Sequence, residues 1–191
     1  LEKIGVCVVN SRTNISTSAD KYRTYIKLKD YGLTQPKTVL VPNEDSLETA
    51  VENLDTKFPI IMKTLRGSKG VGVLYIESER ALSSIVQLMY KTDSNADLLI
   101  QEYIKTDFDV RVMILDGQVI ATMRREVVKG DFRSNFSQGS KVKPYKLTEL
   151  EIEQVLLASK ALGGILSAVD FIASKNPQKI PPYILEVNSS P

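Results

Sequence analysis

The sequence predicts an α+β fold, in which antiparallel strands and helices form separate runs rather than alternating strictly. Short apolar runs recur between turn signals, and the dipeptide Asp116-Gly117 between two of them is typical of a tight β-hairpin. Longer segments carry apolar residues at helical spacing, as in Leu82, Ile85, Val86 and Met89. Hydrophobic residues make up 42% of the 191 residues, which is enough for a buried core in one large domain or two small ones.

In the first half of the chain, apolar runs and turn residues predict four strands and three helices. The strands are expected at residues 4–9, 37–41, 59–63 and 71–76. The first helix should start at Ser16, Ser18 or Asp20 and run to about residue 31, the second should start within 43–45 and run to about 54, and the third should span 78–89. The run at 4–9 contains Cys7, which we expect to be a small buried hydrophobic residue. Because it is the only cysteine, the chain has no internal disulfide, which fits a reducing cytoplasm.

The second half is expected to contain five strands and one helix. The strands are expected at 97–103, 108–115, 119–126, 166–173 and 183–187. Thr148 and Glu151 have the spacing of a capping box, so a helix should begin there and run through Leu162 to the glycines that follow. Residues 127–145 are polar and have little periodicity, and so long a loop in a small domain indicates a functional segment.

The composition excludes several kinds of catalytic site. Histidine is absent, so neither a Ser-His-Asp triad nor a zinc site built from Cys and His is available. Any chemistry must use carboxylates, lysine, arginine, hydroxyl groups or a hard metal ion held by oxygen atoms. The net charge of +2 offers no overall attraction for nucleic acid or an acidic membrane surface. No run of about 18 apolar residues occurs, so we expect no transmembrane helix.

A glycine-rich basic segment lies between two of the expected strands. It reads Arg66-Gly67-Ser68-Lys69-Gly70-Val71-Gly72 and follows Lys63, at the end of the first strand. Glycines let backbone N–H groups approach phosphate oxygens, and lysines add point charges. The segment is either a flap over nucleotide phosphates or a plain hairpin loop. Lys63 is either a phosphate ligand or a strand-end lysine whose stem covers apolar surface.

Two further polar segments have the groups needed to contact a nucleotide. Gln101-Glu102-Tyr103-Ile104 ends a strand, and Asp109 and Arg111 follow it. Backbone groups at a strand end can pair with a base, and a carboxylate can accept hydrogen bonds from ribose hydroxyls. The second segment comprises Arg124-Arg125 and Gly130-Asp131-Phe132-Arg133-Ser134-Asn135. Its arginines either neutralise charge during phosphoryl transfer or belong to a solvated basic loop.

The strongest constellation combines Asp170 with Glu186 and Asn188. Glu186 and Asn188 are two residues apart in an expected strand, so their side chains share one face. Asp170 lies in another apolar strand that can pair alongside. Carboxylates gathered in an apolar setting repel one another unless a cation joins them, and oxygen ligands suit magnesium. The alternative is that these are unrelated polar residues on a solvated face.

Taken in order, these motifs resemble the ATP-grasp superfamily, and within it the RimK-type ligases, which add glutamate to the carboxyl terminus of a ribosomal protein. The resemblance covers residues 10–191 and is most specific in the string 130–135 and in Glu186-Val187-Asn188-Ser189-Ser190-Pro191. It implies an ATP-grasp fold of two α+β subdomains with the nucleotide between them. Residues 1–20 would be the remnant of a preceding domain and linker, 21–97 the small subdomain, and 98–191 the larger, carboxyl-terminally truncated subdomain with the metal site.

The resemblance also implies cofactors and site residues. The cofactors are ATP and Mg²⁺, with Mn²⁺ as an alternative. The nucleotide ligands would be Lys21, Lys63, Gly70, Glu102, Tyr103, Asp109, Arg133, Ser134 and Asn135. The metal ligands would be Asp170, Glu186 and Asn188. The residues acting in catalysis would be Arg111, Arg125 and Arg133.

The implied activity is that of a cytoplasmic, ADP-forming carboxylate–amine ligase. It would form an amide through an acyl phosphate and add glutamate, or a similar amino acid, to the carboxyl terminus of a peptide or of a protein such as a ribosomal protein. A homo-oligomer is compatible with it, whereas nucleic acid and membrane are not expected partners. Two other functions remain open, a non-catalytic ATP-binding module and a kinase that binds ATP in a similar way.

Overall fold

The computed structural model describes residues 2–65, 72–127 and 141–191. The chain forms two compact units, one of Leu1–Gln35 with Thr106–Pro191 and the other of Pro36–Lys105. These boundaries differ from those expected at 20/21 and 97/98. The helix that follows Asp20 belongs to the first unit because its Leu28 is buried in that unit's core. Residues 98–102 belong to the second unit because they form a central strand of its sheet.

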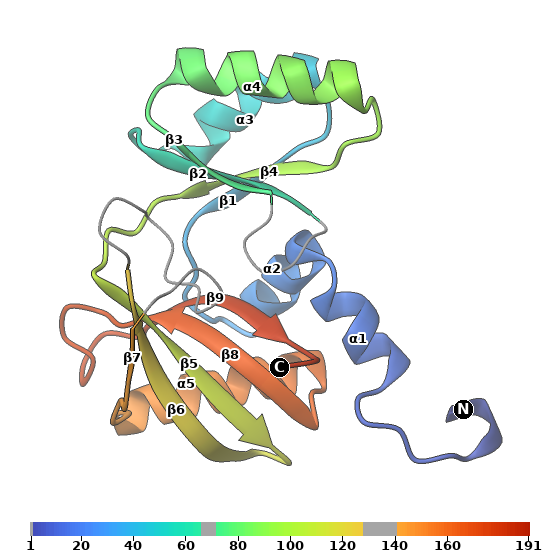
Figure 1. Ribbon diagram of the computed structural model, residues 1–191, viewed down its shortest axis with the longest axis vertical. Helices are drawn as coiled ribbons and strands as arrows, with labels where there is room; N and C mark the ends of the chain where they lie inside the picture. Colours follow the sequence, from blue (N-terminus) through green and yellow to red (C-terminus); the bar gives the residue numbers. More distant parts are fainter. Residues whose placement is uncertain (1, 66–71, 128–140) are drawn as a thin grey trace. The chain divides into compact units, whose positions relative to one another are not determined.

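The unit of Pro36–Lys105 is a four-stranded antiparallel sheet with helices on one side (Figure 1). The sheet order is β1-β4-β2-β3. Its elements are β1 (Thr38–Val41), η2 (Glu44–Ser46), α3 (Leu47–Leu54), β2 (Ile60–Thr64), β3 (Val73–Ile76), α4 (Glu79–Thr92) and β4 (Leu98–Glu102). The strands and helices predicted for this part of the chain are all present, with ends displaced by a few residues.

Side chains of β2 alternate between the two faces of this sheet. Ile60 and Met62 are buried in a core with Leu82 and Val86 of α4. Lys63 therefore points to the opposite face, away from the helices. The start of α4 is fixed as predicted, because the hydroxyl of Ser78 accepts a hydrogen bond of 3.3 Å from the backbone of the helix's first turn.

The other unit contains a five-stranded antiparallel sheet of order β7-β6-β5-β8-β9. Figure 1 shows α5 lying along one face of this sheet. The elements are η1 (Glu2–Ile4), α1 (Arg12–Ser18), α2 (Lys21–Asp30), β5 (Phe108–Leu115), β6 (Gln118–Glu126), β7 (Val142–Lys143), α5 (Glu149–Leu162), β8 (Leu166–Ile172) and β9 (Tyr183–Asn188). None of the helices among the described residues is long and apolar enough to cross a membrane.

Three local sequence signals in this unit are confirmed. Thr148 and Glu151 form the predicted capping box at the start of α5, with each side chain bonded to the backbone N–H of the other residue. At the other end of the helix, Gly163 adopts the left-handed conformation, with φ of 69°. The Asp116-Gly117 turn joins β5 to β6, and both its residues have positive φ. These ends thus follow the local sequence, and distant hydrogen bonds from Thr148 to Pro177 and from Asp116 to Ile165 add to it.

Because side chains alternate along each strand, the five-stranded sheet has one apolar face and one charged face. Val110 and Val112 of β5, and Val169 and Phe171 of β8, are buried in the core with α5. Residues between them in sequence, such as Asp109, Arg111 and Asp170, must face the other way. Asp109, Arg111 and Asp170 therefore lie on the face that α5 does not cover.

The amino-terminal segment differs from prediction. Residues 5–9 form no strand, and Cys7 is exposed rather than buried. The apolar run there has no sheet neighbour among the described residues, so the apolar pattern alone does not produce a strand. Helix α1 was not predicted. It begins at Arg12 and is capped by the preceding Ser11, whose hydroxyl accepts a hydrogen bond of 3.1 Å from the backbone N–H of Asn14.

Candidate active site

Four neighbouring strands bring the predicted metal and arginine residues together. Arg111 of β5 stands opposite Asp170 of β8, which in turn stands opposite Glu186 of β9. Asp109 of β5 stands opposite Arg125 of β6. The sequence places these residues up to 77 positions apart, and the register of the sheet joins them on one face.

Two arginines and two aspartates alternate in a chain of ion pairs on this face. Arg111 donates to both oxygens of Asp170, at 2.7 and 2.6 Å. Arg125 donates to both oxygens of Asp109, also at 2.7 and 2.6 Å. Nη2 of Arg125 also lies 3.1 Å from Oδ2 of Asp170. The order is therefore Arg111–Asp170–Arg125–Asp109, and the four charges sum to zero.

The two arginines differ in their access to solvent. The side chain of Arg125 is 4% exposed, whereas that of Arg111 is 27% exposed. Burial by itself lowers the pKa of Arg125, but the hydrogen bonds and charges of Asp109 and Asp170 outweigh it and raise the pKa. The hydrogen bonds to Asp170 likewise raise the pKa of Arg111. Both groups are held as cations, and only Arg111 has a partly open surface toward a ligand.

Lys21 and Asn188 extend the charged face beyond the ion pairs. Lys21 is the first residue of α2, and burial lowers its pKa, while the charges of Glu186 and Asp20 act in the opposite direction. Asn188 lies two residues beyond Glu186, opposite Ala168 of β8. Its Nδ2 is buried and has no hydrogen-bond partner among the described residues. A buried amide in this state is suited to turn an oxygen toward a bound cation.

The donor set fits a divalent cation that also binds its substrate. Asp170 and Glu186 supply carboxylate oxygens from paired positions, and Asn188 supplies an amide oxygen on the same strand as Glu186. Across the described ranges, no three acidic, His or Cys side chains gather as a metal-binding group. Magnesium suits such a site because it commonly takes only one or two carboxylates and completes its shell with phosphate oxygens and water.

In the other unit, Lys63 lies on the helix-free face of the four-stranded sheet. Its ammonium group donates a hydrogen bond of 2.6 Å to Oε1 of Gln101. The amide of Gln101 donates in turn to the hydroxyl of Thr38, at 2.7 Å. This chain of bonds fixes the direction of the lysine. The supporting role of Thr38 was missed at the sequence level, because β1 and β2 are not adjacent in the sheet and no local pattern links them.

Glu102 and Tyr103 lie at the end of β4 but differ in environment. The backbone N–H of Glu102 donates to the carbonyl of Lys37 at 2.9 Å, and its carboxylate accepts from the N–H of Lys37 at 3.2 Å. The ring of Tyr103 meets that of Tyr75 edge-on, with centroids 5.1 Å apart. A hollow of about 420 Å³ opens there, lined by Lys57, Pro59, Tyr75, Tyr103 and Lys105. Aromatic walls and basic side chains give it the chemistry to accept a flat, anionic ligand.

Several predicted nucleotide ligands lie outside the described residues, namely Gly70, Arg133, Ser134 and Asn135. The end of the glycine-rich segment is described at Gly72, which has φ of +77°. Its carbonyl accepts a hydrogen bond of 3.0 Å from the backbone N–H of Thr64. A Cβ atom at this position would overlap the side chain of Thr64, so only glycine fits.

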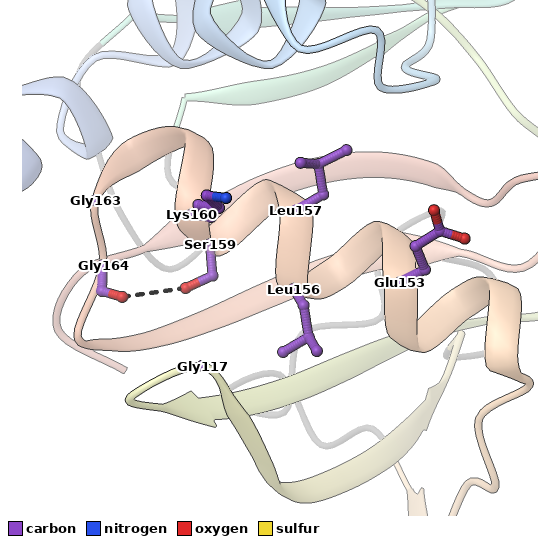
Figure 2. A pocket seen from close by; sticks show the side chains of 8 residues that line it. All are labelled: Gly117, Glu153, Leu156, Leu157, Ser159, Lys160, Gly163 and Gly164. Carbon is purple, nitrogen blue, oxygen red and sulfur yellow. Dashed lines mark hydrogen bonds between the residues drawn. The ribbon is translucent and has the colours of Figure 1, made fainter.

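A larger hollow, of about 560 Å³, lies on α5 and carries none of the predicted site residues. Figure 2 shows Leu156 of α5 pointing toward the β5–β6 hairpin at Gly117, and the hydrogen bond of Ser159 to Gly164 at the end of the helix. Because α5 covers the apolar face of the sheet, this hollow is on the opposite side from Asp170 and Arg111. It is therefore not where the charged groups can act.

Arg124 behaves differently from its neighbour Arg125. It stands opposite Val110, and its guanidinium lies over the ring of Phe108, 4.1 Å from the centroid. It also pairs with Glu126 at 3.5 Å. The alternation of β6 thus separates the two arginines, and only Arg125 reaches the charged face.

Comparisons with known proteins agree with this arrangement. Residues 18–191 match the model of the RimK-like ATP-grasp domain. The chain is 36% identical over 192 aligned residues to a "Probable alpha-L-glutamate ligase" of Coxiella burnetii, and 32% identical to a "Probable alpha-L-glutamate ligase 2" of Pseudoalteromonas atlantica. The alignments cover all of this chain and 62% of each relative. The chain thus spans less than two thirds of the length of these relatives.

Solved structures show the same fold at lower identity. A RimK domain ATP-grasp protein from Sphaerobacter thermophilus superposes with a TM-score of 0.77 at 18% identity, over the whole chain and 67% of that protein. D-alanine–D-alanine ligase from Bacillus anthracis, complexed with ATP, superposes with a TM-score of 0.74 at 22% identity, over the whole chain and 62% of that protein. The α+β fold expected from the sequence is confirmed as an ATP-grasp fold, and the chain belongs to the RimK-like ATP-grasp family.

Proposed function

We propose that this chain is the ATP-binding and catalytic part of a ligase that joins a carboxylate to an amine, with glutamate as the added amino acid. The names of the relatives supply the substrate class. The observation that carries the proposal is the charged face of the five-stranded sheet, where Arg111, Asp170 and Glu186 stand opposite one another on three adjacent strands. Burying ionised groups costs free energy even when they are paired, so their gathering on this face supports a functional role.

Asp170, Glu186 and Asn188 would hold magnesium, or manganese in its place. The metal supplies charge neutralisation on the phosphate oxygens and fixes their direction. The buried, unpartnered Nδ2 of Asn188 and the paired carboxylates support this role. A solved relative of the same fold, the ATP-grasp ligase PsnB, has been seen complexed with a precursor variant, Mg and ADP.

Each unit carries residues that we propose as nucleotide ligands. Lys21 and Lys63 would bind phosphate oxygens as point charges, together with the segment that contains Gly70. Glu102 and Tyr103 would bind the adenine, and Asp109 the ribose. Arg133, Ser134 and Asn135 would complete the set. Support for Lys63 comes from its hydrogen bond to Gln101, which aims the ammonium group before any ligand arrives.

The reaction would proceed in two steps. A carboxylate oxygen of the acceptor attacks the γ-phosphorus of ATP, the bond to ADP breaks, and an acyl phosphate forms. The amine of glutamate then attacks the acyl carbon, phosphate leaves with the bonding electrons, and the nitrogen loses a proton to give the amide. Arg111 and Arg133 would neutralise charge at the moving phosphoryl group. The acceptor would be the carboxyl terminus of a peptide or of a protein such as a ribosomal protein.

The test combines nucleotide turnover with identification of the product. The protein is incubated with ATP, Mg²⁺, glutamate and peptides that end in different residues, and ADP release and peptide mass are followed together. We expect ADP formation that depends on a peptide, with a mass gain of one glutamate residue. A phosphorylated product would instead indicate a kinase, and ATP binding without turnover would indicate a non-catalytic module.

Glu186→Gln supplies the matched variant for this experiment. The side chain keeps its size and loses its charge, so a metal-dependent reaction should fall by at least about 100-fold, the scale of removing one group that stabilises transition-state charge. Glu126→Gln makes the same change outside the proposed site, where the carboxylate pairs with Arg124 and Lys143. Unchanged turnover in Glu186→Gln would rule out the proposed metal role.

A further inference from the structure

Arg125 connects the two carboxylates to which different ligands are assigned. It forms a two-bond pair with Asp109 and a contact of 3.1 Å with Asp170. Under the proposed function, Asp109 binds the ribose and Asp170 binds the metal. We propose that Arg125 is a positioning residue that couples nucleoside binding to metal binding, and that it does not itself contact the substrate.

Burial argues against a direct role for Arg125 at the phosphates. With 4% of its side chain exposed, Arg125 is the most enclosed of these four charged residues, against 8% for Asp109 and Asp170 and 27% for Arg111. Its Nε and Nη2 already donate to Asp109, and Nη2 also lies against Asp170. The side chain of Arg111 is 27% exposed, and Asp170 is its one ion-pair partner among the described carboxylates, so of these two arginines it is the one that can reach a substrate.

The shape of the guanidinium group makes coupling the expected consequence. The group is a rigid plane, and both of its Asp109 bonds lie in a fixed fork. A ribose that draws Asp109 into one orientation therefore also orients Nη2 against Asp170. A metal ion that draws Asp170 away from Nη2 removes one of the two acceptors of this N–H group, which then bonds Asp109 alone. By linkage, each ligand must change the affinity of the other by the same factor.

The experiment uses probes that cannot bind each other. Adenosine carries the base and ribose but no phosphate, so it provides no direct ligand for the metal, and Mn²⁺ binding is read by electron paramagnetic resonance. The affinity for Mn²⁺ is measured with and without saturating adenosine in the wild-type chain and in Arg125→Lys. We expect saturating adenosine to change the affinity for Mn²⁺ at least about fivefold in the wild type. Arg125→Lys should reduce that factor below about twofold, because an ammonium group cannot form the two-bond fork.

Arg111→Lys is the matched control, because it makes the same change at the other arginine of Asp170. It leaves the Arg125–Asp109 pair intact and should retain the wild-type coupling factor, whatever it does to Mn²⁺ affinity itself. Coupling that survives in Arg125→Lys, or that is lost equally in both variants, would overturn the assignment. So would a wild-type protein that binds both probes independently.

A second measurement needs no variant and covers the case in which Arg125→Lys does not fold. The arginine Nε–H resonances of the wild type are followed by ¹⁵N NMR while Mg²⁺ alone is added. The Nε of Arg125 bonds Asp109, not Asp170, so a metal-induced shift must pass through the guanidinium plane. An unmoved resonance at saturating Mg²⁺ contradicts the coupling. If the wild type bound neither ADP nor a metal, the proposed function itself would fall, which is a separate result.

Discussion

Arg111 and Asp170 stand directly opposite each other on β5 and β8 and share two hydrogen bonds of 2.7 and 2.6 Å. The pair fixes the plane of a buried carboxylate before any ligand binds. Asp170 also lies 3.1 Å from Arg125, so two cations hold one proposed metal ligand. Asp170 is therefore preorganised by Arg111 and Arg125.

Arg111→Lys should separate catalysis from folding. Lysine keeps the charge but cannot reproduce the planar fork, so Asp170 loses one of its two orienting partners. We expect an unfolding free energy lower by about 1–3 kcal/mol, the range for a hydrogen bond to a charged group. The lower stability reduces the fraction of folded protein. Turnover should fall at least about tenfold further than this reduction accounts for. Urea denaturation and steady-state kinetics on one preparation measure both. Equal losses in stability and turnover would contradict a role for Arg111 at the substrate.

Asn188→Asp should make folding stability depend more strongly on magnesium. A third carboxylate beside Glu186 and Asp170 repels them when no metal is present, so the metal-free protein should melt at a lower temperature. Added Mg²⁺ should then raise the melting temperature more than in the wild type, because binding stabilises the folded state by mass action. Scanning calorimetry with EDTA and with Mg²⁺ tests this. The exposed Asn95 provides the control, and Asn95→Asp should show no additional response to magnesium.

Lys21→Met should lower the affinity for ATP and increase folding stability at neutral pH. Burial lowers the pKa of Lys21, so in the pH window between its folded and its unfolded pKa the unfolded chain binds more protons and wild-type stability rises with pH. Removing the charge should abolish that rise and increase stability at neutral pH, while ATP affinity falls about tenfold through loss of one phosphate contact. Melting curves from pH 7 to 10 and nucleotide titrations measure the two effects. Lys29→Met, at an exposed position of the same helix, should produce neither.

Asn10→Ala should destabilise the unit that carries the charged face. The Asn10 side chain is buried and makes four hydrogen bonds. It donates to the carbonyls of Leu166 and Ser189, at 2.6 and 2.7 Å, and accepts from the N–H groups of Ile165 and Leu166, at 2.8 and 3.0 Å. Leaving these groups unpaired should cost about 2–3 kcal/mol. Chemical denaturation provides the measurement, and Asn95→Ala should change stability by less than about 0.5 kcal/mol.

The sequence predicted best where structure is local. The capping box at Thr148, the glycine at the end of α5 and the Asp116-Gly117 hairpin depend on neighbouring residues and were confirmed. The run around Cys7 was predicted wrongly as a buried strand, because an apolar run forms a strand only where another strand pairs with it. Asn10 carried no signal at all, since its partners lie more than 150 positions away.

In the candidate site too, some features follow from the local sequence and others depend on distant partners. The convergence of Asp170, Glu186 and Asn188 follows from strand alternation and a plausible pairing, and β8 and β9 do pair. The ion pairs of Asp109 with Arg125 and of Arg111 with Asp170 depend on the register among β6, β5 and β8. A shift of one residue in that register would send either partner to the other face, and nothing in the local sequence fixes it.

The irregularity in β9 determines which of its side chains face the core and which face the charged side of the sheet. Pairing runs from Asp170 and Glu186 directly to Phe171 and Ile184, so Leu185 is an extra residue in the ladder. The two halves of β9 are therefore out of phase, with Ile184 and Val187 both in the core although they are three residues apart. In a regular strand, Ile184 and Glu186 would face the same side, because they are two residues apart. The extra residue Leu185 lets Ile184 enter the core while Glu186 stands opposite Asp170 on the charged face.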